Sequence, residues 1–453
     1  MTRRDLLLAA GAASAFGAAR RPNFVFLLAD DLGASDLGCY GSSFYETPQL
    51  DRFARSALGF TQAYSACPVC SPTRTAIMTG KYPARVGLTD YLPGLQPKDK
   101  PLLSVEDLDE LPLEETTLAE ALRDAGYKTF HTGKWHLGNR PPVEHGFAAQ
   151  LKSPPSKNPA RDAATIEDAL AFIGQSRSDP FFLYLCFTYP HTPVQAVAPH
   201  AERFRAKLAG MNYPEQRLGK ERNGNTRLYQ DNPEYASMLY AMDELAGRVF
   251  NRLDELKLSE NTVVVFTSDN GGLCTHGNPS GGPTANPPFR SGKGWCYEGG
   301  IRVPLMIRAP GVTRAGSTCE VPVISTDFYP TILDLARLPQ KPEQHRDGLS
   351  LAGLLRGGTK LNRDTLYWHY PHYHGSTWAP GAALRHGDWK LIEFYEEGRA
   401  ELYHLRDDIG ERNDLAARMP DLTGKLRAQL REWQEGVGAK MPQKNPAYKP
   451  TSA

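Results

Sequence analysis

Asn23-Phe-Val-Phe-Leu-Leu28, followed after Ala29 by Asp30-Asp31, is the stretch that decides the fold class. It is continuously apolar and then stops at charged residues. Three later strand-like runs have the same form, at residues 127–131, 181–187 and 262–266. Apolar strands without alternation are typical of a parallel sheet covered on both faces by helices. We therefore predict an α/β fold with a large, mostly parallel sheet sandwiched by helices.

Helix-like segments lie between these runs, such as Thr117 to Asp124 and Pro233 to Leu256, as an alternating α/β chain requires. In such sheets ligands bind beyond the carboxyl ends of the strands. A polar cluster follows each of the four strands, so we expect the four clusters to converge on one site. The clusters are Asp30-Asp31, Gly133-Lys134-Trp-His136, Pro190-His191-Thr-Pro193 and Ser268-Asp269-Asn270.

The first and last clusters offer only hard oxygen ligands. Asp30, Asp31, Asp269 and Asn270 include no imidazole and no thiolate, and this chemistry favours Ca²⁺ or Mg²⁺ over zinc. A single Asp-Asp pair also occurs in turns and helix caps. Two such clusters at the ends of two buried strands predict a metal site instead.

A cysteine lies in the stretch Cys67-Pro-Val-Cys70-Ser-Pro-Thr-Arg74. Ser71 followed by Pro72 predicts a helix start, with the Ser71 hydroxyl as N-cap. Cys70 would then lie beside the positive end of a helix, which is a natural anion site. Arg74 falls in the first turn and can face the same anion.

Other interpretations of Cys70 remain open at this point. With Cys67 it forms a Cys-x-x-Cys pair, which suits a redox centre or half of a zinc site, although no second Cys/His pair at zinc spacing follows. A cysteine phosphatase also uses a thiolate at a helix start, but with a longer loop than the three residues between Cys70 and Arg74. A buried, inert cysteine is the third alternative.

Length and composition set broad limits. The 453 residues suffice for one large α/β domain and a smaller one. A net charge of +1 gives no indication of nucleic acid or a membrane surface as partner. The seven cysteines are scattered, so we expect buried thiols rather than a disulfide framework.

The first 19 residues predict an export signal. Thr2-Arg3-Arg4-Asp5-Leu6-Leu7 resembles a twin-arginine motif, and an apolar run follows to Ala19, with small residues suited to cleavage. The run is too short to span a bilayer comfortably. We expect a bacterial periplasmic or secreted protein; the alternative is a basic, disordered N-terminal tail.

Several motifs together resemble the type I sulfatases. Cys70-Ser-Pro-Thr-Arg74, with Thr79-Gly80 shortly after it, is similar to the family signature Cys-x-Pro-Ser/Ala/Thr-Arg. Gly133-Lys-Trp-His-Leu-Gly138, Pro190-His-Thr-Pro193 and Tyr297-Glu-Gly-Gly-Ile-Arg-Val-Pro304 resemble further family motifs, in the same order. The resemblance implies an alkaline-phosphatase-like fold.

The resemblance covers nearly all of residues 22–440 and implies a mechanism. Cys70 would be oxidised to Cα-formylglycine by a formylglycine-generating or anaerobic sulfatase-maturating enzyme. Sulfate monoesters would then be hydrolysed through a formylglycine-hydrate sulfoenzyme intermediate, with Ca²⁺ held by residue 70 and the two oxygen-rich clusters. Asp269 would help to deprotonate the nucleophile. The catalytic residues implied are Cys70, Arg74, Lys134, His136, His191 and Lys293; the metal ligands are Asp30, Asp31, Cys70, Asp269 and Asn270.

The roles of the catalytic residues follow from the same resemblance. Arg74, Lys134 and Lys293 would neutralise the sulfate as an anion cradle. His191, with Lys293, would protonate the departing alcohol. His136 would take a proton from the second hydroxyl of the hydrate, so that sulfate is expelled.

From about residue 360 the pattern changes to short strands, at residues 365–369, 382–386, 389–394 and 400–404. His386-Gly387-Asp388 predicts a hairpin turn, and Leu422 to Trp433 an amphipathic helix. We therefore expect a signal peptide at 1–19, a catalytic α/β domain at 20–358, and a C-terminal subdomain of a small antiparallel sheet plus helix at 359–453.

The stretch Tyr367-Trp-His-Tyr-Pro-His-Tyr-His374 mixes aromatic rings with imidazoles, which suits sugar recognition. A metal cluster and a plain domain interface are alternatives. The stretch resembles bacterial sulfatases that act on galactose or N-acetylgalactosamine sulfates in polysaccharide degradation. A phosphonate monoester or phosphodiester hydrolase of the same superfamily, or a non-catalytic carbohydrate-binding relative, is the alternative function. The substrate-binding candidates are His369, His372, His374 and Arg385.

Overall fold

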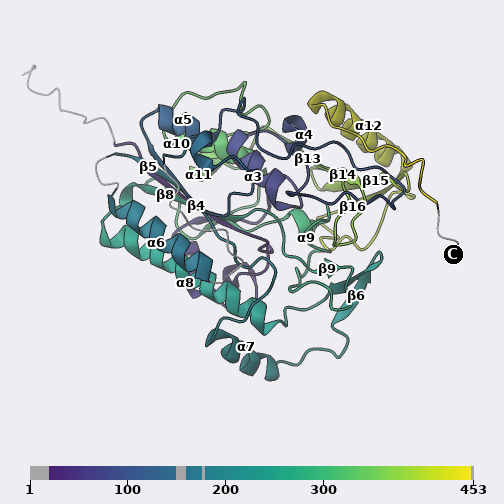
Figure 1. Ribbon diagram of the computed structural model, residues 1–453, viewed down its shortest axis with the longest axis horizontal. Helices are drawn as coiled ribbons and strands as arrows, with labels where there is room; N and C mark the ends of the chain where they lie inside the picture. Colours follow the sequence, from purple (N-terminus) through teal and green to yellow (C-terminus); the bar gives the residue numbers. More distant parts are fainter. Residues whose placement is uncertain (1–19, 149–159, 176–178, 450–453) are drawn as a thin grey trace, which may run out of the picture.

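The strand-like runs form four adjacent strands, β8-β1-β5-β4, of a seven-stranded sheet in the order β11-β2-β10-β8-β1-β5-β4 (Figure 1). β1 (Asn23–Ala29) pairs in parallel with β5 (Phe181–Cys186) and with β8 (Thr262–Ser268), and β4 (Lys128–Gly133) pairs in parallel with β5. β10 (Leu305–Arg308) runs antiparallel to its neighbours. The prediction of a large, mostly parallel sheet is confirmed. Beyond β10 lie β2 (Leu58–Phe60) and then β11 (Ser317–Cys319), which forms that edge of the sheet.

The structure, a computed structural model, describes residues 20–148, 160–175 and 179–449. The predicted export signal at 1–19 lies outside the described residues. Within those ranges no helix combines the length and the apolar character needed to cross a bilayer. All seven cysteines are described; they are free thiols, and only Cys39 is exposed.

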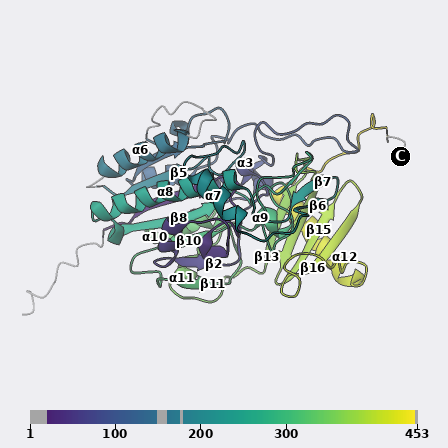
Figure 2. The same ribbon diagram turned by 90° about the horizontal axis from the view of Figure 1, so that it is seen from below.

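Helices cover both faces of the sheet, because both faces of its strands are apolar (Figures 1 and 2). Val25 and Leu27 of β1 pack toward one group of helices, and Phe24 and Phe26 pack toward the other. The first group is α2 (Pro48–Ala54), α6 (Ala160–Gln175), α7 (His200–Ala209) and α8 (Pro233–Glu255); the second is α3 (Cys70–Thr79), α5 (Leu118–Asp124), α10 (Phe328–Leu335) and α11 (Ala352–Leu355).

The helix at Cys70 begins two residues earlier than predicted. Val69 is the N-cap of α3, so Cys70 is the first helical residue, and the predicted capping by Ser71 is wrong. The Ser71 hydroxyl instead accepts a hydrogen bond from the Leu92 backbone N–H at 3.2 Å. The serine therefore ties a distant loop to the helix start, while Pro72 sits in the first turn, where no intrahelical N–H bond is needed.

The C-terminal part has the predicted antiparallel sheet and helix. β13 (Thr365–Tyr370), β14 (Gly381–His386), β15 (Trp389–Phe394) and β16 (Arg399–His404) pair in chain order. α12 (Pro420–Val437) packs its apolar side onto one face of this sheet (Figure 2). The remaining strands are β3 (Ala63–Tyr64), β6 (Leu218–Glu221), β7 (Gly224–Arg227), β9 (Thr275–His276) and β12 (Val323–Ile324). The remaining helices are α4 (Pro83–Val86), α9 (Glu298–Ile301), η1 (Gly38–Tyr40), η2 (Pro142–His145), η3 (Ser259–Asn261) and η4 (Ser325–Asp327).

A buried ion cluster joins the C-terminal sheet to the rest of the molecule. The Lys390 ammonium on β15 lies 2.9 Å from Glu298 of α9 and 2.9 Å from Glu411, and all three side chains are fully buried. A buried charge is tolerated only when its partners remain in place. Lys390 thus holds two carboxylates that would otherwise repel each other.

We expect Lys390→Met to lower the free energy of unfolding by about 3–5 kcal/mol, because it leaves two buried carboxylates without this cation. Urea unfolding measures the loss. The double variant Lys390→Met with Glu411→Gln should recover part of it, since one negative charge is removed. Lys425→Met, on the exposed face of α12, is the matched control and should change stability by less than about 0.5 kcal/mol. Equal stability of Lys390→Met and the control would contradict this account.

Candidate active site

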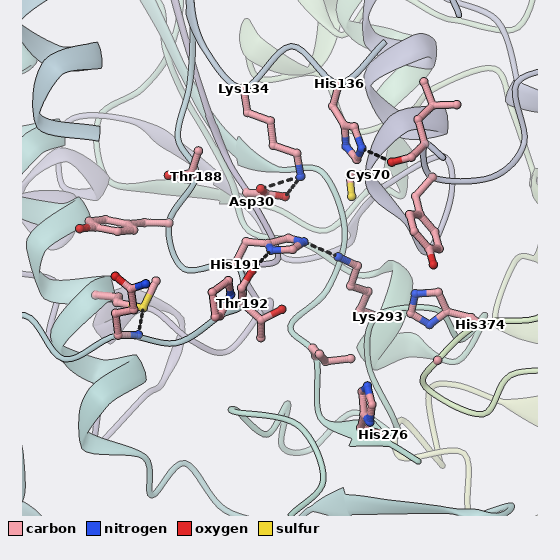
Figure 3. Close-up of a pocket in the computed structure, with 18 of the residues that line it drawn as sticks. Asp30, Cys70, Lys134, His136, Thr188, His191, Thr192, His276, Lys293 and His374 are labelled. Atoms are coloured by element: carbon pink, nitrogen blue, oxygen red, sulfur yellow. Dashed lines mark hydrogen bonds and ion pairs between the residues drawn. The ribbon is translucent and has the colours of Figure 1, made fainter. Parts of the chain in front are cut away.

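The carboxyl ends of the parallel strands open into a cavity of about 600 Å³ (Figure 3). Asp30 follows β1, Lys134 follows β4 and His191 lies just beyond β5. The four polar clusters therefore meet at one edge of the sheet, because parallel strands end on the same side. The predicted site residues that line the cavity are Asp30, Cys70, Lys134, His136, His191, Lys293 and His374.

Cys70 lies at the base of this cavity, where it is 1% exposed. Burial opposes ionisation of its thiol, but the positive charges of Lys134 and Lys293 outweigh burial and lower the pKa well below the ordinary value. Cys67 differs, because burial raises the pKa of its thiol well above the ordinary value, and that thiol faces the Thr89 carbonyl. The two cysteines are thus in different environments. A redox pair or a shared zinc site would place both sulfur atoms in one environment, so this difference favours neither interpretation.

Two lysines neutralise the first pair of carboxylates. Lys134 Nζ donates to both oxygens of Asp30, at 2.7 and 2.9 Å, and Lys293 Nζ lies 2.7 Å from Asp31 Oδ1 and 2.8 Å from Oδ2. Burial raises the pKa of Asp30, but Lys134 and other nearby cations bring it below the ordinary value. The Asp31 backbone has a left-handed φ of 64°, a strained conformation typical of functional sites.

Asp269 and Asn270 complete the oxygen-rich group. Asp269 Oδ1 accepts a hydrogen bond from the Asp31 backbone N–H at 3.2 Å, and Asn270 Nδ2 donates to Asp31 Oδ1 at 2.8 Å. The Asn270 Oδ1 atom is buried and has no hydrogen-bond donor among the described residues. Burial, with the nearby Asp30 charge, raises the pKa of Asp269 to about 7.

These residues fit a hard divalent cation. Ligand atoms of Asp30, Asp31, Cys70 and His191 all lie within 4.8 Å of one another. A cation among them would offset the crowded negative charge and give the Asn270 oxygen a partner. His191 was predicted as a proton donor only, and its place beside the expected ligands is a finding of the structure.

Arg74 is not part of the cavity wall. It is fully buried; its Nε and Nη2 donate to Asp269 Oδ2 at 2.9 and 2.7 Å, and its Nη1 donates to the Lys134 carbonyl at 2.6 Å. Its predicted contact with the anion is therefore replaced by contacts behind the site. Arg74 positions Asp269 and the Lys134 backbone.

Two histidines face the reacting region. The His191 Nδ1 atom is hydrogen-bonded to the Thr192 carbonyl, and Lys293 Nζ lies 3.0 Å from His191 Nε2. His136 has a left-handed φ of 56°, and its Nε2 bonds the Leu92 carbonyl at 2.7 Å. Its Nδ1 is buried without a partner among the described residues, and its ring lies next to the Cys70 sulfur (Figure 3).

Of the four predicted substrate-binding residues, the structure brings only His374 to the cavity (Figure 3). Its Nδ1 accepts a hydrogen bond from the Ser376 N–H at 3.1 Å, which leaves the proton on Nε2. Gly294 allows this loop to approach, since a Cβ at that position would lie 2.2 Å from His374 Nδ1.

The other three candidates lie away from the cavity and bond to protein groups. His369 contacts the Lys440 carbonyl at 3.0 Å, and His372 contacts the Thr89 hydroxyl at 2.8 Å. Arg385 donates to the Gly387 carbonyl at 2.8 Å and stacks near Tyr64. His372 and Arg385 thus lie between the two parts of the chain, as the alternative of an interface predicts, whereas the His369 contacts with Tyr395, Gln434 and Lys440 lie within the C-terminal part.

Some lining residues were not predicted from the sequence. His276, Gln195 and Met238 line the cavity, although no motif pointed to them; Met238 lies within the predicted helix at Pro233 to Leu256. The only available signal for His276 is its place six residues after Asn270. Tyr91, Leu92 and Pro93 also line the cavity.

Fold and site together define a hydrolase of the alkaline-phosphatase-like class. A family model described as Sulfatase matches residues 22–338, and a model described as N-sulphoglucosamine sulphohydrolase, C-terminal, matches residues 291–436. The chain belongs to the sulfatase family, and it is therefore a sulfuric ester hydrolase.

Individual relatives agree with this assignment. The chain is 30% identical to N-acetylgalactosamine-6-sulfatase of Homo sapiens, over 95% of this chain and 89% of that protein. It is 30% identical to a sulfatase of Formosa agariphila, over 91% of this chain and 89% of that protein. The crystal structure of Ps i-CgsB is similar with a TM-score of 0.76 and 26% identity, covering 95% of both chains.

We expect Ca²⁺ to raise the melting temperature, because a ligand that binds only the folded state stabilises it. Differential scanning fluorimetry with and without Ca²⁺ measures the shift. The variant Asn270→Ala should reduce the shift at a fixed Ca²⁺ concentration, because the unpartnered Asn270 Oδ1 is one of the expected oxygen ligands. Asp99→Asn, which changes an exposed carboxylate elsewhere, should leave the shift unchanged. A larger shift with Zn²⁺ than with Ca²⁺ would contradict the assignment of a hard cation.

Proposed function

We propose that this enzyme releases inorganic sulfate from sulfated sugars of the galactose or N-acetylgalactosamine type, using a formylglycine made from Cys70 and a Ca²⁺ ion. One observation carries the proposal: the Cys70 side chain meets two lysines, two histidines and the oxygen-rich cluster in a single cavity. The names of two relatives support the sugar class, since one is N-acetylgalactosamine-6-sulfatase and Ps i-CgsB has been crystallised with a neocarrahexaose.

The formylglycine, as its hydrate, would supply a hydroxyl nucleophile at position 70. Lys134 and Lys293 line the cavity, and their positive charges bind the sulfate group and stabilise charge that develops on its oxygens. The buried Asp269 lies among the expected metal ligands and helps to deprotonate the nucleophile. Arg74 acts through Asp269, whose carboxylate it holds in place.

Proton transfer falls to the two histidines. Because His191 Nδ1 is hydrogen-bonded to a carbonyl, its proton stays there, and Nε2 exchanges a proton on the cavity side. Lys293, next to that Nε2, replenishes the proton that goes to the departing alcohol. The unpartnered Nδ1 of His136 faces residue 70 and accepts a proton from it.

Asp30, Asp31, Asp269 and Asn270, with the side chain at position 70, would hold the Ca²⁺ ion. Bound there, the ion supplies positive charge that favours ionised oxygens on the nucleophile and on the sulfate. The carboxylate oxygens of the three aspartates and the amide oxygen of Asn270 are the donors that Ca²⁺ prefers. The unpartnered Asn270 oxygen supports the choice of Ca²⁺ over a soft metal.

The remaining parts of the proposal concern the whole chain. We place the division between the catalytic domain and the C-terminal subdomain at residues 358 and 359. The twin-arginine-like N-terminus supports export to the periplasm or outside the cell. A formylglycine-generating or anaerobic sulfatase-maturating enzyme is then a required partner in the cell.

We expect the peptide of residues 56–74, taken from protein made in the native host, to contain one reactive thiol instead of two. Mass spectrometry after alkylation measures this, and Cys67 in the same peptide is the internal control. Cys70→Ala should lower the turnover of p-nitrophenyl sulfate by at least about 10³-fold while leaving thermal unfolding unchanged, because only the nucleophile is removed. Two alkylated thiols, or sulfate release by Cys70→Ala, would refute the formylglycine mechanism.

His374 should contribute to sugar binding. Burial and the charge of Lys293 lower the pKa of its imidazole to about 3, so the neutral ring offers its Nε2–H as a donor. We expect His374→Ala to raise KM for N-acetylgalactosamine 6-sulfate or galactose 6-sulfate about tenfold and to leave p-nitrophenyl sulfate within about twofold.

The same assay, run with sulfate and phosphate esters in Ca²⁺ and in Mn²⁺, separates the proposed sulfatase from a phosphonate monoester or phosphodiester hydrolase. Faster turnover of phosphate diesters in Mn²⁺ would favour that alternative.

For the His374→Ala variant, an equal rise in KM for p-nitrophenyl sulfate and for the sugar sulfates would show that the substitution disturbs the catalytic groups.

A further inference from the structure

A second, larger groove adjoins the catalytic cavity. It has a volume of about 960 Å³, at the upper end of the range typical of ligand sites, and His374 lines both spaces. Five separate parts of the chain form its walls: the loop at 95–101, the turn between β6 and β7, the loop at 373–379, Glu396 in the turn between β15 and β16, and the segment at 447–449. A ligand that fills the catalytic cavity can therefore continue past His374 into this groove.

The groove has a surplus of positive charge. Four basic residues line it, against the two acidic residues Asp99 and Glu396. Glu396 is already engaged by Arg222 and by the Tyr373 hydroxyl. Within the part of the chain that the structure describes, none of the three lysines has an ion-pair partner. These lysines are Lys98, Lys100 and Lys449.

Arg222 adds a second, independent observation. Its Nη2 atom pairs with Glu396 and Glu397, whereas its Nη1 atom is buried and has no acceptor among the described residues. A buried donor without an acceptor indicates that an unseen acceptor belongs there. Arg222 lies in the turn between β6 and β7, on the wall of the groove.

The basic wall is fixed by the C-terminal segment. Asn445 Nδ2 donates to the carbonyls of Lys98 and Lys100 at 3.0 and 2.9 Å, and its backbone N–H donates to the Pro101 carbonyl at 2.8 Å. An antiparallel bridge joins Leu102 to Lys444. The loop that carries the two lysines is thus held before any ligand arrives, which lowers the entropic cost of binding.

Aromatic side chains complete the groove. Tyr373, Trp378 and Tyr448 line it, and the Lys100 ammonium lies 6.0 Å from the centre of the Tyr373 ring. Tyr373 and Trp378 are buried and support the wall, whereas the Tyr448 ring is partly exposed. An exposed aromatic face next to hydrogen-bond donors suits a sugar ring, while unpaired ammonium groups suit an anion attached to it.

We propose that this groove binds the sulfate ester of a second sugar unit, adjacent to the unit whose sulfate is removed. The preferred substrate is then an oligosaccharide or polysaccharide with sulfate on successive units, not a sulfated monosaccharide. The inference rests on the proposed sulfatase function, because it concerns the substrate of the same site.

The test compares disulfated tetrasaccharides with monosulfated disaccharides of the same backbone, one pair from chondroitin 6-sulfate and one from κ-carrageenan. We expect kcat/KM to be about tenfold or more higher for the tetrasaccharide of at least one pair. This preference should decrease at an ionic strength of about 0.5 M, because salt screens exposed charges. The triple variant Lys98→Ala, Lys100→Ala, Lys449→Ala should abolish it and leave p-nitrophenyl sulfate turnover unchanged.

The matched control removes three exposed lysines away from the groove, with Lys341→Ala, Lys360→Ala and Lys425→Ala, and should keep the preference. Equal kcat/KM for tetrasaccharide and disaccharide, no turnover of either backbone, or a preference that survives the groove variant would overturn the inference. In each of these cases the turnover of p-nitrophenyl sulfate by the unaltered enzyme shows whether the sulfatase assignment itself still holds.

Discussion

The gathering of buried carboxylates at the end of a parallel sheet is the constraint on which the site depends. Asp30, Asp31 and Asp269 are brought together because neighbouring strands run in the same direction, and their mutual repulsion in a buried place must be offset. Lys134, Lys293 and Arg74 supply the offsetting charges. The same arrangement of charges underlies the proposal of a cation among the oxygens and an anion beside the lysines.

Cys70 takes its chemistry from this charge arrangement more than from its own sequence motif. Cys67 lies three residues earlier and is equally buried, yet the pKa of its thiol is raised where that of Cys70 is lowered. The difference comes from Lys134 and Lys293, which reach residue 70 from other parts of the chain. A reactive position in this protein is thus defined by long-range packing, and the local helix start only aims the side chain into the cavity.

The strands, their direction and the meeting of four polar clusters could be predicted because each depends on local pattern: apolar runs, turn residues and the shared edge of parallel strands. Predictions failed where a side chain bonds to a residue that is distant in the sequence, because only the folded structure shows which partner is near. Ser71 bonds Leu92 instead of capping its helix, and Arg74 bonds Asp269 instead of facing the cavity. The histidine-rich stretch was ambiguous for the same reason, since only packing decides that His374 reaches the cavity while His369 and His372 do not.

Recognition and chemistry are coupled through a small number of contacts between the two parts of the chain. Trp295, two residues after Lys293, donates its indole N–H to the Ser376 carbonyl at 2.8 Å and packs edge-on against Trp378. The loop that carries Lys293 is therefore joined directly to the loop that carries His374. Because the Lys390 cluster fixes the sheet behind that loop, a sugar bound at His374 is held in a defined position relative to Lys293. In the proposed function, binding energy from distant sugar units would act at the sulfate and so turn substrate length into rate.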